Sequence, residues 1–209
     1  LKFILTVYGG LFIQLFIVYA IIFVLFTRLN PFRFLRKMLP VILFAFSTSS
    51  SNATIPLNLE TLERKCGVDE KVASFTIPLG ATINMSGTAI MQGVAVVFVA
   101  QAFGIDLSTS ALMTVVITAV TAAIGTAGVP GVGTIMLAMV FESVGLPAAG
   151  IAMIMGVDRI LDMGRTAVNV TGDAVVTMCM ASLTKTLDRN VFQSRNEDLI
   201  EEPAKAPSE

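Results

Sequence analysis

The sequence predicts an all-α membrane protein, and two observations support that prediction. The mean hydropathy is +0.81, and only 14% of the 209 residues are charged, which is too apolar for an ordinary soluble domain. Between Lys71 and Asp158 the only charged residues are Asp106 and Glu142. Long apolar runs of this kind are typical of helices that cross a lipid bilayer.

The residue types that are scarce exclude several classes of function. Histidine is absent, and the two cysteines, Cys66 and Cys179, are far apart with no CxxC spacing. These features argue against a zinc site and a disulfide framework. The net charge is −1 and no basic patch is mixed with aromatic residues, so we expect no nucleic-acid partner. The chain begins at Leu1, immediately before an apolar span, which predicts that N-terminal helices of a longer protein are missing.

The first part of the chain is predicted to contain one transmembrane helix and one re-entrant hairpin. Residues 3–28 are long enough to cross the bilayer, and the basic residues that follow place this end in the cytoplasm: Arg28, Arg33, Arg36 and Lys37. Residues 32–71 begin with an apolar piece too short to span, continue through the polar run Ser47–Pro56, and end in charged residues. Such a segment enters the membrane and returns. The alternative is a soluble serine-rich linker, which the apolar flank argues against.

The middle of the chain repeats this plan. Residues 72–104 are predicted as a broken transmembrane helix, because Gly80–Thr88 is rich in small and hydrogen-bonding residues. Irregular backbone at this depth is tolerated only where it lines a cavity. Residues 111–146 are two short apolar pieces around Gly125–Gly133, which predicts a second re-entrant hairpin, entered from the outer side. The alternative is two full spans, but neither half reaches ~17 residues.

The last part is predicted as a polar-striped transmembrane helix over residues 147–181, followed by a disordered cytoplasmic tail over residues 183–209. Two hairpins entered from opposite faces, each paired with a broken or striped helix, form an inverted pseudo-repeat. Interrupted segments at corresponding positions of two halves indicate a transporter site at the middle of the membrane. Residues 1–182 are therefore predicted to be one membrane transport domain.

The polar stripe of the last helix is the strongest functional signal. At about 100° per residue, its polar residues fall within an arc of about 100°: Asp158, Asp162, Arg165, Thr166, Asn169 and Asp173. Ionisable residues at membrane depth cost at least ~2.5–3.5 kcal/mol each unless they face a cavity and find partners. The stripe therefore predicts a site for a small zwitterion and for cations. The alternative is a structural network of ion pairs that satisfy one another.

Four motifs, occurring in this order, resemble the signatures of the dicarboxylate/amino acid:cation symporters, the family of the glutamate and aspartate transporters. They are Ser50–Pro56, Asn84–Thr88, Gly125–Gly131 and Asp162–Asp173. The resemblance covers roughly residues 1–182. It implies the C-terminal, mobile part of a secondary active symporter in the plasma membrane. Such a symporter would couple uptake of an acidic amino acid, glutamate or aspartate, to a cation gradient, with Na⁺ as the expected cation, by an elevator-type movement. Family members carry further N-terminal helices that assemble them as homotrimers.

The resemblance also implies roles for individual residues. Arg165 would pair with the side-chain carboxylate of the substrate and Asp162 with its ammonium group. The rest of the substrate shell would be Ser51, Thr88, Val129, Gly133, Thr166 and Asn169. One sodium site would consist of Gly80, Asn84, Asn169 and Asp173. A second would consist of Thr82, Met85, Ala123, Ile124 and Thr126. Oxygen ligands of this kind suit a hard cation, and no other cofactor is expected.

Two departures from the family pattern leave alternatives open. Ser86 stands where many members have an aspartate of a third sodium site, so the stoichiometry and the choice of Na⁺ or H⁺ stay open. Ser49 stands where some members have an arginine, and we hypothesise that Arg159 replaces it through a salt bridge to Asp158 or Asp162 in one state of the transport cycle. A C4-dicarboxylate or a neutral amino acid is the alternative substrate. An intramembrane hydrolase is a remote alternative. It is disfavoured because the acidic residues of the stripe share one helix and histidine is absent.

Overall fold

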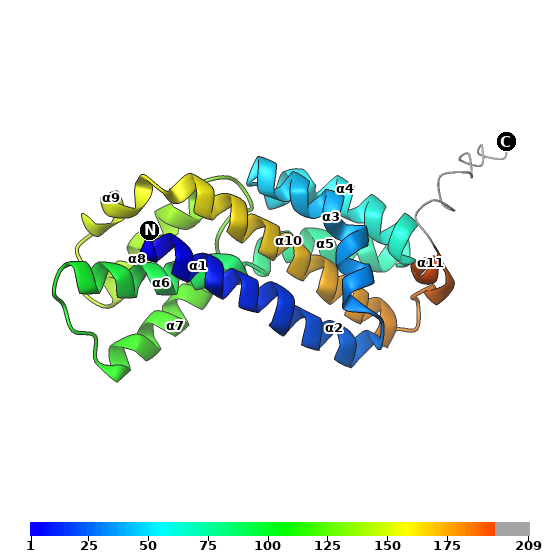
Figure 1. Ribbon diagram of the computed structural model, residues 1–209, viewed down its shortest axis with the longest axis horizontal. Helices are drawn as coiled ribbons and strands as arrows, with labels where there is room; N and C mark the ends of the chain where they lie inside the picture. Colours follow the sequence, from blue (N-terminus) through cyan, green and yellow to red (C-terminus); the bar gives the residue numbers. More distant parts are fainter. Residues whose placement is uncertain (195–209) are drawn as a thin grey trace.

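The computed structural model describes residues 1–194, and every regular element in that range is helical (Figure 1). The all-α prediction is therefore confirmed. The elements are α1 (Lys2–Ile13), the π-helical turn η1 (Gln14–Val18), α2 (Tyr19–Thr27), α3 (Pro31–Thr48), α4 (Ser51–Cys66), α5 (Glu70–Ile83), α6 (Ser86–Ala102), α7 (Thr109–Ile124), α8 (Val132–Ser143), α9 (Gly150–Met155), α10 (Asp158–Leu183) and α11 (Arg189–Gln193).

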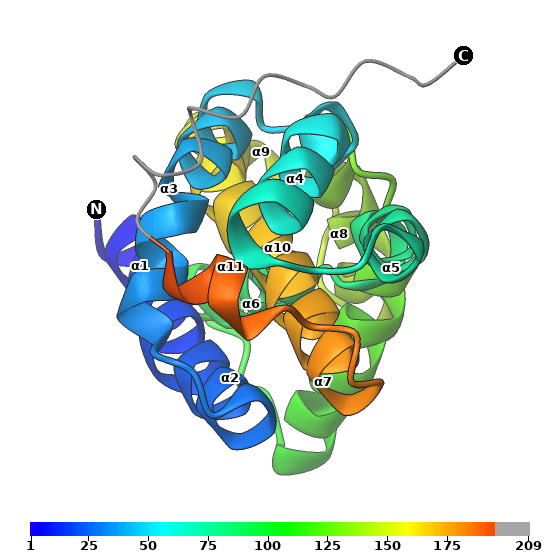
Figure 2. The same ribbon diagram turned by 90° about the vertical axis from the view of Figure 1, so that its right-hand side faces the viewer.

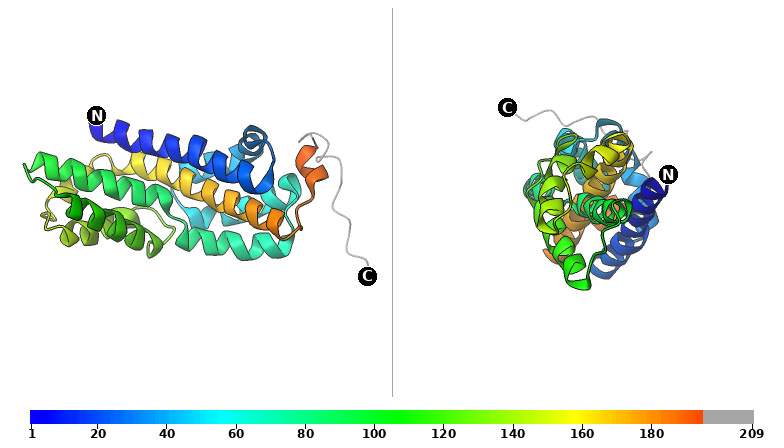
Figure 3. Two further views of the ribbon diagram at one scale, coloured as in Figure 1. Left: turned by 90° about the horizontal axis from the view of Figure 1, so that it is seen from below. Right: turned by 90° about the vertical axis from the view of Figure 1, so that its left-hand side faces the viewer.

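Within the described residues, three helical stretches are long and apolar enough to cross a membrane: Lys2–Thr27, Glu70–Ala102 and Asp158–Leu183. All three run along the long axis of the molecule (Figure 3, left). Helices α7 and α8 are apolar but shorter. Large apolar side chains such as Leu25, which is 69% exposed, cover the outer surface. A surface of this composition fits a lipid environment and not water.

Helix α10 is the central element of the fold. It packs against α1, α2, α3, α4, α5 and α6, and the end-on view in Figure 2 shows it enclosed by them. Most of its residues are buried, including the charged Asp162 and Arg165. Because the polar stripe faces protein on every side, its charges avoid the large cost of contact with acyl chains.

The first span contains a π-helical turn between α1 and α2. The buried residues of this span recur every four positions on each side of the turn. They are Phe3, Val7 and Leu11 before it, and Tyr19, Phe23 and Thr27 after it. In a regular α-helix each step of four rotates the side chain by about 40° beyond a full turn, so a period of four drifts around the helix. The wider turn at Gln14–Val18 takes up part of that drift and keeps both halves of the stripe on the buried side.

Two helical hairpins approach each other with their tips. Helices α3 and α4 form the first, joined at Ser49 and Ser50, where Ser49 adopts a left-handed φ of 53°. Helices α7 and α8 form the second, joined through Gly125–Gly131, where Gly131 has a φ of 80°. Both pairs pack along their length. We propose that both are re-entrant in the membrane, since the hydrophobic length of each arm is short.

The helix predicted over residues 72–104 is interrupted at Asn84 and Met85, inside the interval Gly80–Thr88 that the sequence singled out. Both residues leave the helical region, with φ and ψ of −100° and 73° for Asn84 and −108° and 46° for Met85. The interruption separates α5 from α6, and the N-cap residue of α6, Met85, makes no capping hydrogen bond with its own side chain.

The last predicted helix, residues 147–181, is divided in the structure. Residues Gly150–Met155 form the separate short helix α9, and α10 begins only at Asp158. Gly156 ends α9, and Val157 leaves the helical region with a φ of −120°. The apolar composition of this stretch hides the division, because glycine at a helix end lowers helix propensity without interrupting the apolar run.

The prediction of disorder from residue 183 onward is wrong for α11, whereas residues 195–209 lie outside the described part of the chain. Asp188 caps α11 by accepting from the amides of Asn190 and Val191. The ammonium of Lys37 donates to the carbonyl oxygens of Lys65 (2.5 Å) and Val191 (3.1 Å). These contacts order the segment although its composition is polar.

Phe192 completes the anchoring of α11. Its ring is 1% exposed and lies 6.3 Å from the ring of Phe23, centroid to centroid. The ammonium of Lys37 lies 5.5 Å from the centre of the same ring. Burial lowers the pKa of Lys37 from its ordinary value, and the two carbonyls and the aromatic face compensate the buried charge.

Candidate functional site

A small polar cavity lies where α10 meets the two hairpin tips. Asp162 and Arg165 are each 3% exposed and Asn169 is 2% exposed. The cavity has a volume of ≈ 10 Å³, the space of about one water molecule. Its lining contains all of the predicted substrate residues: Ser51, Thr88, Val129, Gly133, Asp162, Arg165, Thr166 and Asn169. Residues that are far apart in the sequence are thus brought together at one place, although their role in binding stays a prediction.

Asp162 and Arg165 form a buried ion pair at the centre of this cavity. The guanidinium donates from Nε (2.9 Å) and Nη2 (2.8 Å) to Oδ1 of Asp162. The amide of Gly131, in the second hairpin, donates to Oδ2 of the same carboxylate at 2.8 Å. Nη1 of Arg165 has no hydrogen-bond partner among residues 1–194, and a Cβ atom on Gly133 would overlap it. Nε and Nη2 of the guanidinium are thus held by Asp162, whereas Nη1 has no partner among the described residues.

The two hairpin tips bind directly to each other above this pair. The amide of Asn52 and the hydroxyl of Ser50 both donate to the carbonyl oxygen of Gly128, at 3.1 and 2.9 Å. Gly128 fits tightly, because a Cβ there would lie 2.7 Å from Oδ1 of Asn52 and 3.1 Å from the carbonyl oxygen of Ala81. The tips therefore cover the cavity in this structure.

Asn169 links α10 to the interruption between α5 and α6. Its Oδ1 accepts from the amide of Gly87 at 2.7 Å, and its Nδ2 donates to the hydroxyl of Thr88 and to the sulfur of Met85, both at 3.2 Å. One side chain of α10 thereby satisfies an orphan amide at the start of α6. The unwound backbone is held in a fixed position beside Asp162 and Arg165.

Part of the first predicted cation set lies on the other side of this interruption. Nδ2 of Asn84 donates to Oδ1 of Asp173 at 2.9 Å, and a Cβ on Gly80 would lie 2.7 Å from the same oxygen. Asp173 is 2% exposed and makes no salt bridge to a basic residue of the described chain. A buried carboxylate without a cationic partner is costly, and carboxylate oxygens are ligands that suit a small hard cation.

The second predicted cation set is less closely assembled. Ala123 and Thr126 are buried, whereas Ile124 is 50% exposed. The hydroxyl of Thr126, just beyond the end of α7, donates to the carbonyl oxygen of Ala122 in the last turn of that helix at 2.8 Å. The hydroxyl of Thr82 donates to Leu79 in its own helix at 2.7 Å. The side-chain oxygens of this set therefore point to their own backbones, which leaves main-chain carbonyls as its remaining ligands.

The sequence did not point to Gln92, which holds the backbone of Gly133, one of the residues that line the cavity. Its side chain is 0% exposed, and Nε2 donates to the carbonyl oxygen of Gly133 at 3.1 Å. Its Oε1 has no partner among the described residues. Gln92 thus ties the second hairpin to α6, next to Arg165. A lone amide in the apolar run Ala89–Ala100 is the signal that points to it.

The hypothesised ion pair of Arg159 is not present in this structure. Arg159 is exposed, and within the described residues the salt bridges join Arg64 to Glu60 and Arg165 to Asp162. Asp158 instead accepts a hydrogen bond from the hydroxyl of Thr134. Both arginines lie three residues from Asp162 on α10, so spacing along the helix does not choose between them. Arg165 lies on the buried side of Asp162 and Arg159 on the exposed side, which is why Arg165 forms the pair.

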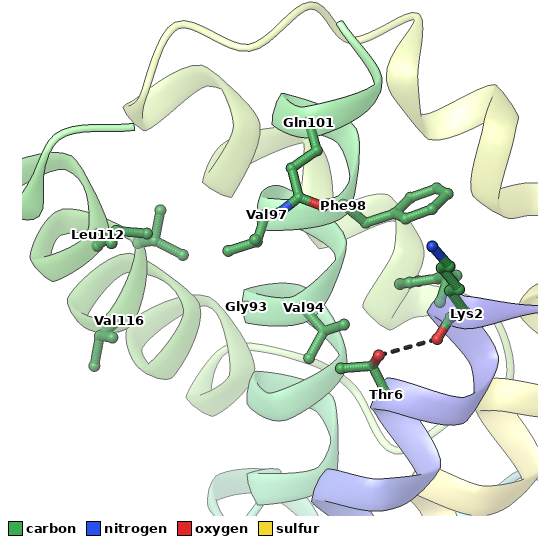
Figure 4. Close-up of a pocket in the computed structure, with 11 residues that line it drawn as sticks. Lys2, Thr6, Gly93, Val94, Val97, Phe98, Gln101, Leu112 and Val116 are labelled. Atoms are coloured by element: carbon green, nitrogen blue, oxygen red, sulfur yellow. Dashed lines mark hydrogen bonds between the residues drawn. The ribbon is translucent and has the colours of Figure 1, made fainter. Parts of the chain in front are cut away.

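A separate apolar groove of ≈ 600 Å³ lies between α1, α6 and α7 (Figure 4). Aliphatic and aromatic side chains such as Val97 and Phe98 line most of it, and its polar members are Lys2, Thr6 and Gln101. None of the polar residues of α10 reaches this groove. It is therefore not the site that the sequence predicted.

An enclosed polar helix, two helical hairpins that meet at their tips, and an interrupted helix beside a buried carboxylate define a membrane protein of the transporter type. Residues 1–183 match the model of the sodium:dicarboxylate symporter family. The chain belongs to this family.

Individual relatives agree with this assignment. The chain is 45% identical over 180 residues to excitatory amino acid transporter 3 of Mus musculus, covering 86% of this chain and 34% of the relative. It is 43% identical over 174 residues to neutral amino acid transporter A of Bos taurus, covering 83% and 33%. It is 40% identical over 194 residues to excitatory amino acid transporter 1 of Rattus norvegicus, covering 93% and 35%. The chain thus spans about a third of the length of these curated relatives.

Proposed function

We propose that the full-length protein is a secondary active symporter that takes up an acidic amino acid, glutamate or aspartate, together with cations. The observation that carries this proposal is the guanidinium of Arg165, which is buried, paired on one face with Asp162, and free at Nη1. An unsatisfied buried donor is costly, and a carboxylate accepts such N–H groups with good geometry. The side-chain carboxylate of the substrate is the partner we assign to Nη1.

The ammonium group of the substrate is assigned to Asp162. Its carboxylate already accepts from Arg165 and from the amide of Gly131, and a carboxylate has further lone pairs for a cationic group. The hydroxyls of Thr88 and Thr166 and the amide of Asn169 lie in the same cavity lining. They are assigned to the α-carboxylate. This arrangement complements both charges of a zwitterion and the additional charge of an acidic side chain.

A neutral amino acid is the second candidate substrate. It is supported by the relative named neutral amino acid transporter A, which is about as similar to this chain as the excitatory amino acid transporters are. Arg165 favours the acidic substrate, because a neutral side chain would leave Nη1 buried and unpaired. A C4-dicarboxylate is less well supported, since it has no ammonium group for Asp162. Transport, and not catalysis, is also what the family and the names of the relatives support.

Na⁺ is proposed as the coupling ion. The family is named for sodium, and the buried carboxylate of Asp173 lies beside the side chain of Asn84 and the backbone of Gly80, two residues that also carry oxygen atoms. The donor set fits a hard cation. Several co-transported cations offset the negative charge of the substrate, and each inward positive charge gains about 2.3 kcal/mol per 100 mV of membrane potential.

Loading the site requires the hairpin tips to separate. A cavity of ≈ 10 Å³ admits about one water molecule, which is too little for an amino acid. The hydrogen bonds of Asn52 and Ser50 to Gly128 are the contacts that must open and close again. We propose that the closed domain then moves across the membrane as one body, in the elevator mode, against a scaffold formed by helices absent from this chain.

The distribution of basic residues supports a proposal for the location and orientation of the full-length protein. We propose a multi-pass protein of the plasma membrane whose C-terminal end is cytoplasmic, because the basic residues after α2 lie at the end of the molecule that also holds α11. Assembly as a homotrimer through the absent N-terminal helices is part of this proposal.

The test is uptake by the full-length protein in proteoliposomes. Labelled aspartate, glutamate, serine and succinate are compared under an imposed Na⁺ gradient, a proton gradient and neither. We expect uptake of aspartate or glutamate that requires the Na⁺ gradient. Uptake of serine alone would identify the neutral amino acid carrier, and uptake driven only by protons would overturn the choice of cation.

A further inference from the structure

Tyr19 is not one of the predicted site residues, yet its side chain forms a hydrogen bond with a residue of another helix. Its phenolic oxygen lies 2.5 Å from the hydroxyl of Ser86. Tyr19 is 6% exposed and belongs to α2, whereas Ser86 is the first residue of α6. The bond therefore joins the first span to the point where the α5–α6 helix is interrupted.

The phenolic group of Tyr19 also lies against the proposed cation site. A Cβ atom on Gly172 would overlap the phenolic oxygen, and the same Cβ would lie 2.6 Å from Nδ2 of Asn84. Asn84 in turn donates to Asp173. Gly172 thus lets the tyrosine hydroxyl and the asparagine amide approach the backbone of α10 at the same place, one residue before the buried carboxylate.

The local structure of the first span supports a specific role for this tyrosine. Tyr19 follows directly after the π-helical turn Gln14–Val18, and its amide donates to the carbonyl of Gln14. A π turn is a rare and strained feature that is frequently found at functional sites. Here it brings Tyr19 back onto the buried face beside α10.

The interruption between α5 and α6 is consequently held from two sides. From α10, Asn169 binds the amide of Gly87 and the side chains of Met85 and Thr88. From α2, Tyr19 binds Ser86. Asn84 directly precedes these attached residues in the chain, and its side-chain amide donates to Asp173.

We propose that Tyr19 is a positioning residue of the cation site at Asp173, and that it acts through Ser86 by fixing the interrupted backbone that carries Asn84. This inference rests on the proposed cation-coupled function and adds two residues to it. Neither residue need touch the ion. The bond fixes the ligands before the cation arrives, so that less ordering is required when it binds.

The test measures cation binding by the purified full-length protein without substrate. Thermal unfolding is followed as a function of Na⁺ concentration, with choline keeping the ionic strength constant, because a ligand that binds the folded state raises its melting temperature. The variants are Tyr19→Phe, Ser86→Ala and the double variant. Tyr8→Phe is the matched control: its hydroxyl makes an equally short bond, 2.5 Å to the Ile160 carbonyl, in the same span but away from Asp173.

We expect each single variant to raise the Na⁺ concentration for half-maximal stabilisation by about threefold to tenfold, the value of one hydrogen bond. The double variant should shift no further than the larger single shift, because both changes remove the same bond. Tyr8→Phe should leave the Na⁺ curve unchanged. Melting temperatures without Na⁺ show whether a variant is damaged in its fold.

The outcomes separate the inference from the function beneath it. If the wild-type protein responds to Na⁺ and Tyr19→Phe gives the same curve, or if the two single shifts add fully, the positioning role is wrong and the proposed function stands. If Tyr8→Phe shifts the curve as much as Tyr19→Phe, the effect is general to the span and the inference is again wrong. If the wild-type protein shows no Na⁺ response at all, both the inference and the proposed sodium coupling fall.

Discussion

The amide of Asn52, at the tip of the α3–α4 hairpin, donates to the carbonyl oxygen of Gly128, at the tip of the α7–α8 hairpin, at 3.1 Å. These residues are 76 positions apart in the numbering of the sequence, and they join the two helical hairpins beside the cavity that Gly128, Asp162 and Arg165 line. In the mechanism proposed above, this contact between backbone and backbone controls access to the site, and side-chain chemistry alone does not reveal it.

A disulfide across this contact should lock the site. A Cβ on Gly128 would lie 2.7 Å from Oδ1 of Asn52, so the variant Asn52→Cys/Gly128→Cys brings two thiols within bonding range. We expect the oxidised protein to lose uptake and to regain it on reduction. The natural cysteines should not interfere, because both are buried and burial raises the pKa of Cys66 to about 12, which leaves little thiolate near pH 8.

The single-cysteine variants are the controls for this lock. Each should show the same uptake with oxidant as without it, although Gly128→Cys should transport less than wild type because its Cβ meets Asn52 and the carbonyl of Ala81. A fully formed disulfide that leaves uptake unchanged would show that the tips need not part.

Asp162→Asn should distinguish an amino acid from a dicarboxylate as substrate. Loss of the carboxylate removes the assigned partner of the ammonium group and leaves Arg165 without its buried counter-ion, an effect of about 2–5 kcal/mol for a buried charge pair. We expect uptake of aspartate to fall by at least about thirtyfold, with uptake of succinate falling less or rising. Competition of labelled aspartate by succinate measures the change.

Asp158→Asn is the matched control, because this neighbouring carboxylate accepts from Thr134 and lies outside the lining of the polar cavity. It should preserve the preference for aspartate. Equal losses in the two variants would indicate a general electrostatic effect and not a contact with the ammonium group.

Gly133→Ala should weaken substrate binding without unfolding the protein. A Cβ at this position would overlap Nη1 of Arg165, so the guanidinium must turn away from the place where the substrate carboxylate is expected. We predict a KM for aspartate raised by about tenfold, the cost of roughly one good hydrogen bond. Gly93→Ala is the control, since nothing lies within 4 Å of a Cβ there. An unchanged KM for Gly133→Ala would remove the assigned contact.

Phe192→Ala should release α11 from the rest of the protein. The ring is 1% exposed and packs beside Phe23 and Lys37, and truncation of a buried aromatic ring costs about 3–5 kcal/mol. We expect faster amide hydrogen exchange at the backbone of α11 and an unchanged rate in α10. Phe26→Ala, at a ring that is 44% exposed, should leave exchange in α11 as it was. Slow exchange in both variants would show that the ring does not hold this helix.

The sequence predicted the buried faces of helices well wherever polar residues recur on one side of a helix. The period of the polar stripe in α10 places Asp162, Arg165 and Asn169 on one face, and the structure buries that face. The short apolar arms of the hairpins and the glycine- and serine-rich tips that join them can also be predicted from the composition of these segments. Both features depend on local periodicity and on the exclusion of charge from lipid, which a sequence displays directly.

The hydrogen-bond and ion-pair partners of individual side chains were harder to predict than the helix faces on which these side chains lie. The sequence did not decide whether Arg159 or Arg165 pairs with Asp162, and it gave no reason to connect Tyr19 with Ser86 or Gln92 with Gly133. These bonds join separate elements, so they depend on how helices rotate against each other. Helix α11 was missed for the same reason, because its order comes from Lys37 and Phe192 packing against the first hairpin and not from its own propensity.

The most direct test of the central claim is equilibrium binding of labelled aspartate to the purified full-length protein in Na⁺, compared between wild type and Arg165→Cys. The free nitrogen of Arg165 is the feature that assigns an acidic substrate to the cavity between α10 and the hairpin tips. We predict saturable binding to the wild-type protein that is lost when choline replaces Na⁺, and at least about a hundredfold weaker binding to the variant, as expected for a lost buried charge contact. Unchanged affinity of Arg165→Cys for aspartate would contradict the account.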